Sequence, residues 1–147
     1  MRYYAVFDTN VLVSSFLTKN ADSATARVID AIADEVIVPL YNAEILAEYN
    51  EVLHRDKFSF QEETIATALK VIRQFGIEVL ASPTGEILPD MDDLVFYEVT
   101  MEKREDDAYL ITGNLKHFPE RPYIVTPGEM MKIIDGETKQ SSERRAE

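Results

Sequence analysis

The chain has 147 residues, no cysteine and a net charge of −12. This length suits one domain with its own hydrophobic core, and the lack of cysteine excludes disulfides, thiolate metal sites and thiol nucleophiles. The charge argues against phosphate binding by a broad basic face, so a metal ion would have to help hold a polyanionic substrate. No apolar stretch reaches the roughly 18 residues of a membrane span and no signal-peptide core begins the chain, so we expect a cytoplasmic protein away from membranes.

Strand and helix patterns alternate through the first half of the chain. Residues 3–7 are predicted to form a buried strand, and helices are expected over 11–17 and 23–33. A β-branched run at 36–38 predicts a second strand, which Pro39 is expected to end. Asn42 is a candidate cap for a helix that runs to about residue 55.

The same alternation continues to the end of the fold. We expect a helix over 61–75 closed by Gly76, a strand at 77–80, and a helix from 91 to about 102 capped by Asp90. Strands at 109–112 and 123–125 follow, and Pro127 opens a last short helix. This order predicts an α/β fold with a doubly wound, mostly parallel sheet of about five strands. The domain is expected over 1–134, and 135–147 as a polar, disordered tail.

Asp8 directly follows the first strand, at the edge where open parallel sheets collect their ligands. The other polar candidates belong to different elements: Glu48, Asp90, Asp92, Asp93 and Asn114. Carboxylates brought together at this edge would repel one another unless a divalent cation lay between them. Oxygen ligands select hard ions, so Mg²⁺ or Mn²⁺ is the expected occupant.

The acids near helix starts also have a purely structural interpretation. Asp8, with Thr9 and Asn10 behind it, could cap the helix that follows. Asp90 is more often a helix cap, and Asp92 and Asp93 could complement the helix dipole.

The remaining candidates have equally ordinary explanations. Glu48 could lie on a solvated helix face and pair with a neighbour such as Arg55. Asn114 could belong to a turn, and we expect His117 to be a surface residue. Only the joint pattern of the acids therefore points to a site.

Taken together, four segments resemble the PIN-domain family: Val6 to Leu12, Glu48-Tyr49 with Val52-Leu53, Asp90 to Asp93 with Phe96, and Leu110 to Pro119. The resemblance covers about residues 3–131 and is closest to the toxin components of bacterial and archaeal toxin-antitoxin pairs. It implies a three-layer α/β/α fold and a metal-dependent ribonuclease. Three or four acids would hold one or two Mg²⁺ or Mn²⁺ ions.

By position, Asp8, Glu48 and Asp93 match the family's first three acids, although Asp92 could take the place of Asp93. Asn114 stands where many relatives have a fourth Asp, so a second metal ion should bind less firmly. Residues 103–107 replace the usual glycine-containing link. The resemblance thus implies catalytic roles for Asp8, Glu48, Asp93 and Asn114, metal binding by Asp8, Glu48, Asp92 and Asp93, and supporting roles for Thr9, Asn10, Asp90 and Thr112.

An RNA substrate is implied, with a cognate antitoxin protein and a homodimer as expected partners. Local phosphate contacts are expected from Lys19, Arg55, Lys57 or Lys116. One alternative is a PIN-like binding module with weak catalysis. Another is an Asp-based phosphatase or phosphotransferase, but haloacid-dehalogenase-like enzymes need a second Asp where Asn10 stands.

Overall fold

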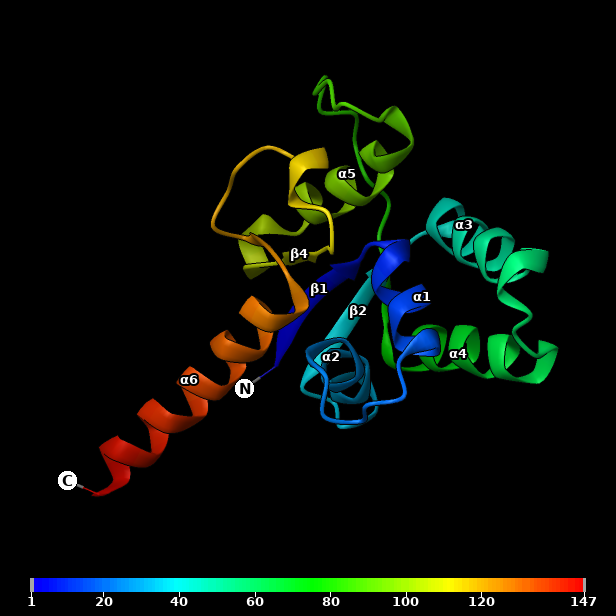
Figure 1. Ribbon diagram of the computed structural model, residues 1–147. Coiled ribbons are helices and arrows are strands. Elements are labelled where there is room, and N and C mark those ends of the chain that lie inside the picture. The colour runs from blue at the N-terminus through cyan, green and yellow to red at the C-terminus, as the bar shows by residue number, and fades with distance from the viewer. Residues whose placement is uncertain (1, 147) are drawn as a thin grey trace.

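A five-stranded parallel sheet forms the centre of the computed structural model, which describes residues 2–146, with side chains described for residues 2–136 (Figure 1). The strands are β1 (Tyr3–Phe7), β2 (Ile37–Tyr41), β3 (Ile77–Glu78), β4 (Tyr109–Ile111) and β5 (Ile124–Val125). Their order is β3-β2-β1-β4-β5, and every neighbouring pair is parallel. This confirms the predicted fold class, with a sheet that is wholly rather than mostly parallel.

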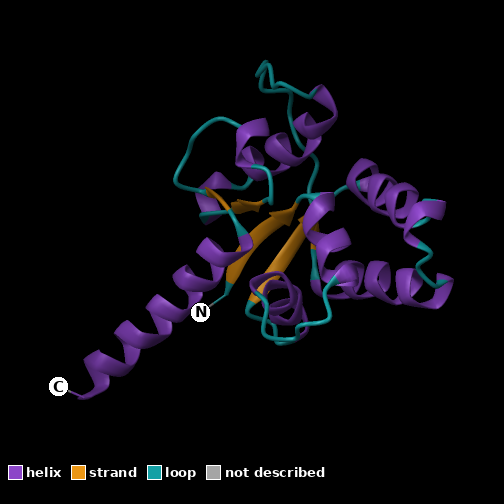
Figure 2. Ribbon diagram, in the orientation of Figure 1, coloured by secondary structure: helices purple, strands orange, loops and turns teal. Residues whose placement is uncertain are grey.

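Helices cover both faces of this sheet (Figure 2). They are α1 (Thr9–Leu17), α2 (Ala24–Ala33), α3 (Ala43–Leu53), α4 (Glu62–Phe75), α5 (Leu94–Glu102) and α6 (Pro127–Ala146). Short 3₁₀ turns add η1 (Asp56–Phe58), η2 (Met91–Asp93), η3 (Arg104–Asp106) and η4 (Leu115–His117). The three-layer α/β/α arrangement expected from the sequence is therefore present.

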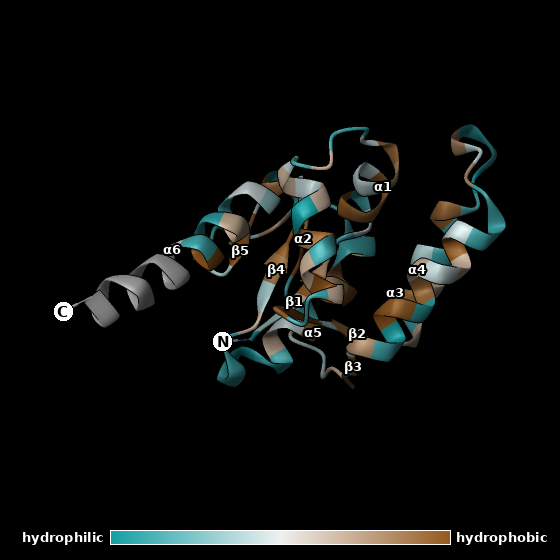
Figure 3. Ribbon diagram, turned by 90° about the horizontal axis from the view of Figure 1, so that it is seen from below, coloured by the Kyte–Doolittle hydropathy of each residue, from teal (hydrophilic) through white to brown (hydrophobic). Residues whose placement is uncertain are grey.

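The core divides into two layers because successive strand residues point to opposite faces. Tyr3, Ala5 and Phe7 of β1 pack in a cluster with residues of α2 and α6. Val6 packs on the other face, in a cluster with residues of α3, α4 and α5. Apolar residues accordingly concentrate on the strands and the helix surfaces that meet them (Figure 3). The sheet is buried on both faces, and only its edges remain for polar chemistry.

Two of the predicted helix caps form the expected hydrogen bonds. The side chain of Asn42 accepts a hydrogen bond from the backbone N–H of Ile45, at 2.8 Å. The side chain of Asp90 accepts one from the N–H of Asp92, at 3.0 Å. Because each side chain satisfies an N–H that lacks a helical partner, it sets where α3 and η2 begin.

The prediction that Pro39 ends the second strand was wrong. Pro39 lies inside β2, in register with Ala5 of β1. β2 pairs with β3 only from Leu40 onward, so the missing N–H of Pro39 removes no bond from that ladder. The sheet tolerates a proline here because β3 is too short to reach it.

Gly76 ends α4, as predicted, and close packing explains why this residue is glycine. A Cβ at this position would lie 2.4 Å from the carbonyl oxygen of Ile72 and 2.5 Å from that of Pro39. Both contacts are with backbone, so neither neighbour can move aside. The missing side chain lets α4 turn directly into β3.

The last helix begins at Pro127, as expected, but it is not short. α6 continues to Ala146 without an interruption at residue 135. The side chains of 137–147 lie outside the described residues, so the separate polar tail over 135–147 stays a prediction. None of the helices in the described part of the chain has the length and apolarity needed to cross a membrane.

Candidate functional site

Asp8 lies at the carboxyl edge of the sheet, between the end of β1 and the start of α1. Its backbone N–H continues the ladder by donating to the carbonyl of Ile111 on β4, at 2.9 Å. Asp8 occupies the N-cap position of α1, yet its side chain makes no capping bond. Only 5% of the residue is exposed. The capping interpretation therefore does not account for this carboxylate.

Residues from the end of β4 hold the Asp8 carboxylate instead. The hydroxyl of Thr112 donates to Oδ2 of Asp8 at 2.8 Å, and the amide of Asn10 approaches the same oxygen at 3.4 Å. The other end of the Asn10 amide accepts the N–H of Gly113, at 3.1 Å. Thr112 and Asn10 thus contact the Asp8 carboxylate, and their supporting role in a metal site stays a prediction.

Glu48 comes to this edge on α3. The next residue, Tyr49, is buried and its hydroxyl donates to the carbonyl of Phe7 at the end of β1. This bond fixes α3 against β1, and Glu48, one residue away on the helix, accepts a hydrogen bond from the hydroxyl of Thr9. Arg55 pairs with Glu51 rather than with Glu48, at 3.0 Å. The solvated ion pair considered for Glu48 is therefore not formed.

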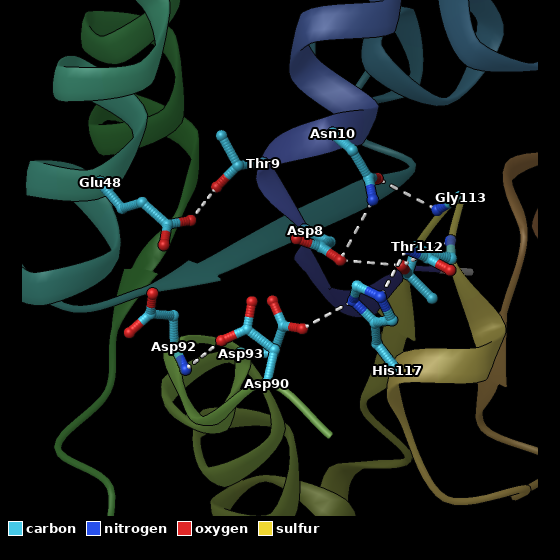
Figure 4. Close-up of polar contacts among 11 residues, drawn as sticks. Asp8, Thr9, Asn10, Glu48, Asp90, Asp92, Asp93, Thr112, Gly113 and His117 are labelled. Carbon is cyan, nitrogen blue, oxygen red and sulfur yellow. Dashed lines mark hydrogen bonds and ion pairs between the residues drawn. The ribbon is translucent and has the colours of Figure 1, made fainter. Parts of the chain in front are cut away.

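The acids that precede α5 face the same region (Figure 4). Asp90 is the helix cap described above, and its exposed carboxylate accepts the hydrogen bond from the N–H of Asp92. Asp92 lines a cavity of about 390 Å³ together with Glu48, whereas Asp93 bonds to a histidine and lies close enough to Asp8 to affect its charge. Both candidates for the third acid consequently adjoin the site, Asp93 on the Asp8 side and Asp92 on the Glu48 side.

His117 belongs to this group as well, although the sequence suggested only a surface residue. Its Nδ1 lies 3.0 Å from Oδ2 of Asp93, and its Nε2 lies 3.0 Å from the side-chain nitrogen of Asn114. The nitrogen of Asn114 thus contacts His117, not an acid. The available signal was the spacing Asn114-x-x-His117, because residues three apart come together on a 3₁₀ turn such as η4.

Burial dominates the electrostatics of the three inner carboxylates. It raises the pKa of Asp8 to about 6; the Asp93 charge adds to the rise, while the hydrogen bond from Thr112 opposes it. Burial also raises the pKa of Glu48, with further contributions from Asp8 and Asp92. The pKa of Asp93 is raised mainly by burial, against the hydrogen bond with His117. Each carboxylate disfavours the ionised form of its neighbours, and a bound cation would offset this repulsion.

Comparison with known families identifies the fold. A family described as PIN domain matches residues 4–116, which include Asp8, Glu48, Asp92, Asp93 and Asn114. The chain belongs to the PIN-domain family. PIN domains are generally metal-dependent nucleases. No curated protein and no solved structure gives a significant match.

The donor set of this PIN domain suits a hard divalent cation. It offers carboxylate oxygens from Asp8, Glu48, Asp92 and Asp93, the ligands that Mg²⁺ and Mn²⁺ prefer. Among the described residues, no three acidic or histidine side chains stand close enough to hold one ion as they are placed. Three of the carboxylates are instead each bonded to a neighbour: Asp8 to Thr112, Glu48 to Thr9, and Asp93 to His117. Each of these bonds engages one oxygen of its carboxylate, so the second oxygen could ligate an ion if the carboxylates moved closer together.

Within residues 2–136, none of the basic residues considered for phosphate binding forms an ion pair with these carboxylates. Arg55 is committed to Glu51, and the ammonium of Lys57 lies 5.0 Å from the ring centre of Phe58. Lys19 is exposed beyond the end of α1, and Lys116 is exposed next to His117 in η4. No phosphate contact is assigned by these positions, and substrate binding by these residues stays a prediction.

Proposed function

We propose that this PIN domain is a Mg²⁺- or Mn²⁺-dependent endoribonuclease and the toxin of a toxin-antitoxin pair. The observation that carries the proposal is the environment of the Asp8 carboxylate. A carboxylate at an N-cap position ordinarily accepts a helix N–H, but this one is buried beside other acids and bonded to Thr112. Burying charge in this way costs stability, which a functional role explains.

Asp8 and Asp93 would hold the main ion, and Glu48 with Asp92 would hold a second ion or its water. When bound, the ion supplies positive charge that draws electrons from the phosphate and makes a nearby water easier to deprotonate. Thr9 and Thr112 keep the carboxylates of Glu48 and Asp8 oriented through their hydroxyl bonds. Asn114, without a negative charge, would weaken the second site.

The proposed reaction is hydrolysis of an RNA phosphodiester. The oxygen of water forms a bond to phosphorus in line with the bond to the 3′ oxygen, which breaks. The water releases one proton as it attacks, and the 3′ oxygen takes up a proton and leaves as a hydroxyl, so that the other product carries a 5′-phosphate. No side chain forms a covalent bond, so the buried acids need only hold charge and orient water.

The biological setting rests on family resemblance alone. We propose a cytoplasmic toxin, a homodimer, whose RNase activity is restrained by a cognate antitoxin protein. Coexpression with the product of a neighbouring gene tests this: a toxin should arrest growth alone and be silenced by its partner. Growth that is unaffected by the wild-type protein would remove the toxin role but leave the nuclease role intact.

The nuclease proposal is tested with purified protein and end-labelled single-stranded RNA. Cleavage should require Mg²⁺ or Mn²⁺, stop with a chelator, and leave a 5′-phosphate. Cleavage in the presence of excess chelator would overturn the metal-dependent mechanism. Tight Mn²⁺ binding without cleavage of RNA or single-stranded DNA would favour a binding module, and phosphate trapped on Asp8 by an acyl-phosphate donor would favour a phosphotransferase.

A further inference from the structure

His117 is held on both sides of its ring. One ring nitrogen lies 3.0 Å from Asp93, and the other lies 3.0 Å from the side-chain nitrogen of Asn114. The Asp93 side chain is only 15% exposed, whereas 40% of the His117 side chain is exposed. Asp93 is therefore the more buried partner of the pair. The family match ends at residue 116, so it assigns nothing to His117.

The chemistry of the two contacts decides which ring nitrogen carries the proton. The amide nitrogen of Asn114 can only donate, so Nε2 of His117 accepts. In the neutral ring the proton is then on Nδ1, from which it is donated to Oδ2 of Asp93. Asn114 thus sets the tautomer in which His117 can orient a carboxylate.

These bonds belong to a longer chain that joins two acids from different parts of the fold. The backbone N–H of Asn114 donates to the hydroxyl of Thr112 at 3.0 Å, and that hydroxyl donates to Asp8 at 2.8 Å. Hydrogen bonds therefore run without a break from Asp8 through Thr112, Asn114 and His117 to Asp93. One chain relates the orientations of the carboxylates at the exit of β1 and the start of α5.

We propose that His117 is a positioning residue that, with its tautomer set by Asn114, orients Asp93 for binding a divalent cation. The inference rests on the proposed metal-dependent function of the same site. A purely structural His117 would contribute packing at a partly exposed position, and its loss would leave metal affinity unchanged. A positioning role instead predicts a loss of affinity of roughly 10- to 100-fold when the bond to Asp93 is removed.

The test compares three variants, H117A, H117N and H117Q, in the full-length protein. The amide nitrogen of Asn can take the place of Nδ1, whereas that of Gln can take the place of Nε2. We expect H117A and H117Q to bind Mn²⁺ about 10- to 100-fold more weakly than wild type. H117N should stay within a few-fold of wild type, because it can still donate to Asp93. Mn²⁺ affinity is measured by calorimetry and by the electron paramagnetic resonance of free Mn²⁺.

His54 provides a matched control, since it also bonds a carboxylate, that of Glu62, but on the exposed end of α3. H54A should bind Mn²⁺ as wild type does. Unchanged affinity in H117A, or equal rescue by H117N and H117Q, would overturn the positioning role while leaving the nuclease proposal standing. Mn²⁺ binding that follows the expected series in a protein that cuts no RNA would overturn only the nuclease. Failure of the wild type to bind Mn²⁺ overturns both.

Discussion

Two cavities of similar size lie at opposite edges of the sheet, and their charges differ completely. The cavity at the carboxyl edge, of about 390 Å³, is lined by four carboxylates and by apolar side chains: Glu44, Glu48, Asp92, Glu98, Met91, Leu94 and Val95. Within the described part of the chain, no Lys or Arg pairs with Asp8, Glu48, Asp92 or Asp93. The negative charge here is concentrated and uncompensated.

The cavity at the amino edge, of about 340 Å³, mixes both signs. Its charged lining residues are Arg2, Arg104, Asp106 and Asp107. Arg104 donates to the carbonyl of Ala108 at 2.6 Å and lies 4.0 Å from the ring centre of Tyr123. Arg2 pairs with the exposed Glu35 at 3.7 Å. Positive and negative side chains lie together at the amino edge, whereas the acids at the carboxyl edge have no Lys or Arg partner among the described residues.

The largest expected effect comes from neutralising the inner acid. Replacing Asp8 by Asn should lower metal-dependent RNA cleavage by about 10²–10³-fold or more, because a buried charge that acts on the reaction is lost. The matched change at the amino edge, D106N, should leave cleavage unchanged. Initial rates at saturating Mn²⁺ and circular dichroism of both variants provide the measurement. Full activity in D8N would remove Asp8 from the site.

The second effect is a pH dependence of stability in the metal-free protein. The folded pKa of Asp8, about 6, is above its ordinary value of 3.8, so folded protein retains a proton that unfolded chain releases. The stabilising contribution of Asp8 to the free energy of unfolding is therefore fully present below about pH 4 and is lost as pH rises through 6. Between pH 4 and 7, D8N should gain about 3 kcal/mol relative to wild type.

Urea unfolding with chelator at several pH values measures this difference. D106N serves again as the control, since it should track the wild type throughout. A stability difference between D8N and wild type that stays constant with pH would contradict the raised pKa of Asp8.

Adding a divalent cation should offset the stability cost of the ionised Asp8 carboxylate at the carboxyl edge. Mn²⁺ at 100 times its dissociation constant should stabilise wild type and D106N by about 2.7 kcal/mol, because it binds the folded state alone. D8N should respond much less, since it lacks one charged ligand. Thermal unfolding with and without Mn²⁺ gives the comparison, and equal stabilisation of all three proteins would place the ion elsewhere.

The smallest effect concerns the residue that aligns α3. Tyr49→Phe keeps the ring but removes the bond to the carbonyl of Phe7, and should cost about 1 kcal/mol of unfolding free energy. Tyr109→Phe, at the amino edge, should change stability by less than about 0.5 kcal/mol. Urea unfolding distinguishes the two. Equal effects would show that the hydroxyl of Tyr49 does not anchor α3.

Much of the fold could be predicted because its signals are local. The apolar run at β1 and the β-branched run at β2 predicted central strands, and Asn42 and Asp90 predicted caps that the structure confirms. The place of Pro39 could not be predicted in this way. Whether a missing N–H matters depends on how far the neighbouring strand extends, and β3 begins only opposite Leu40.

The sequence by itself determined that acids stand at the ends of strands and starts of helices, since these positions follow from apolar patterning. Tertiary structure alone decided what each acid does there. Asp8 bonds to a residue 104 positions away instead of capping its own helix, and Asp93 meets His117 across 24 positions. Such partners depend on how separate elements pack, and sequence spacing carries no information about those distances.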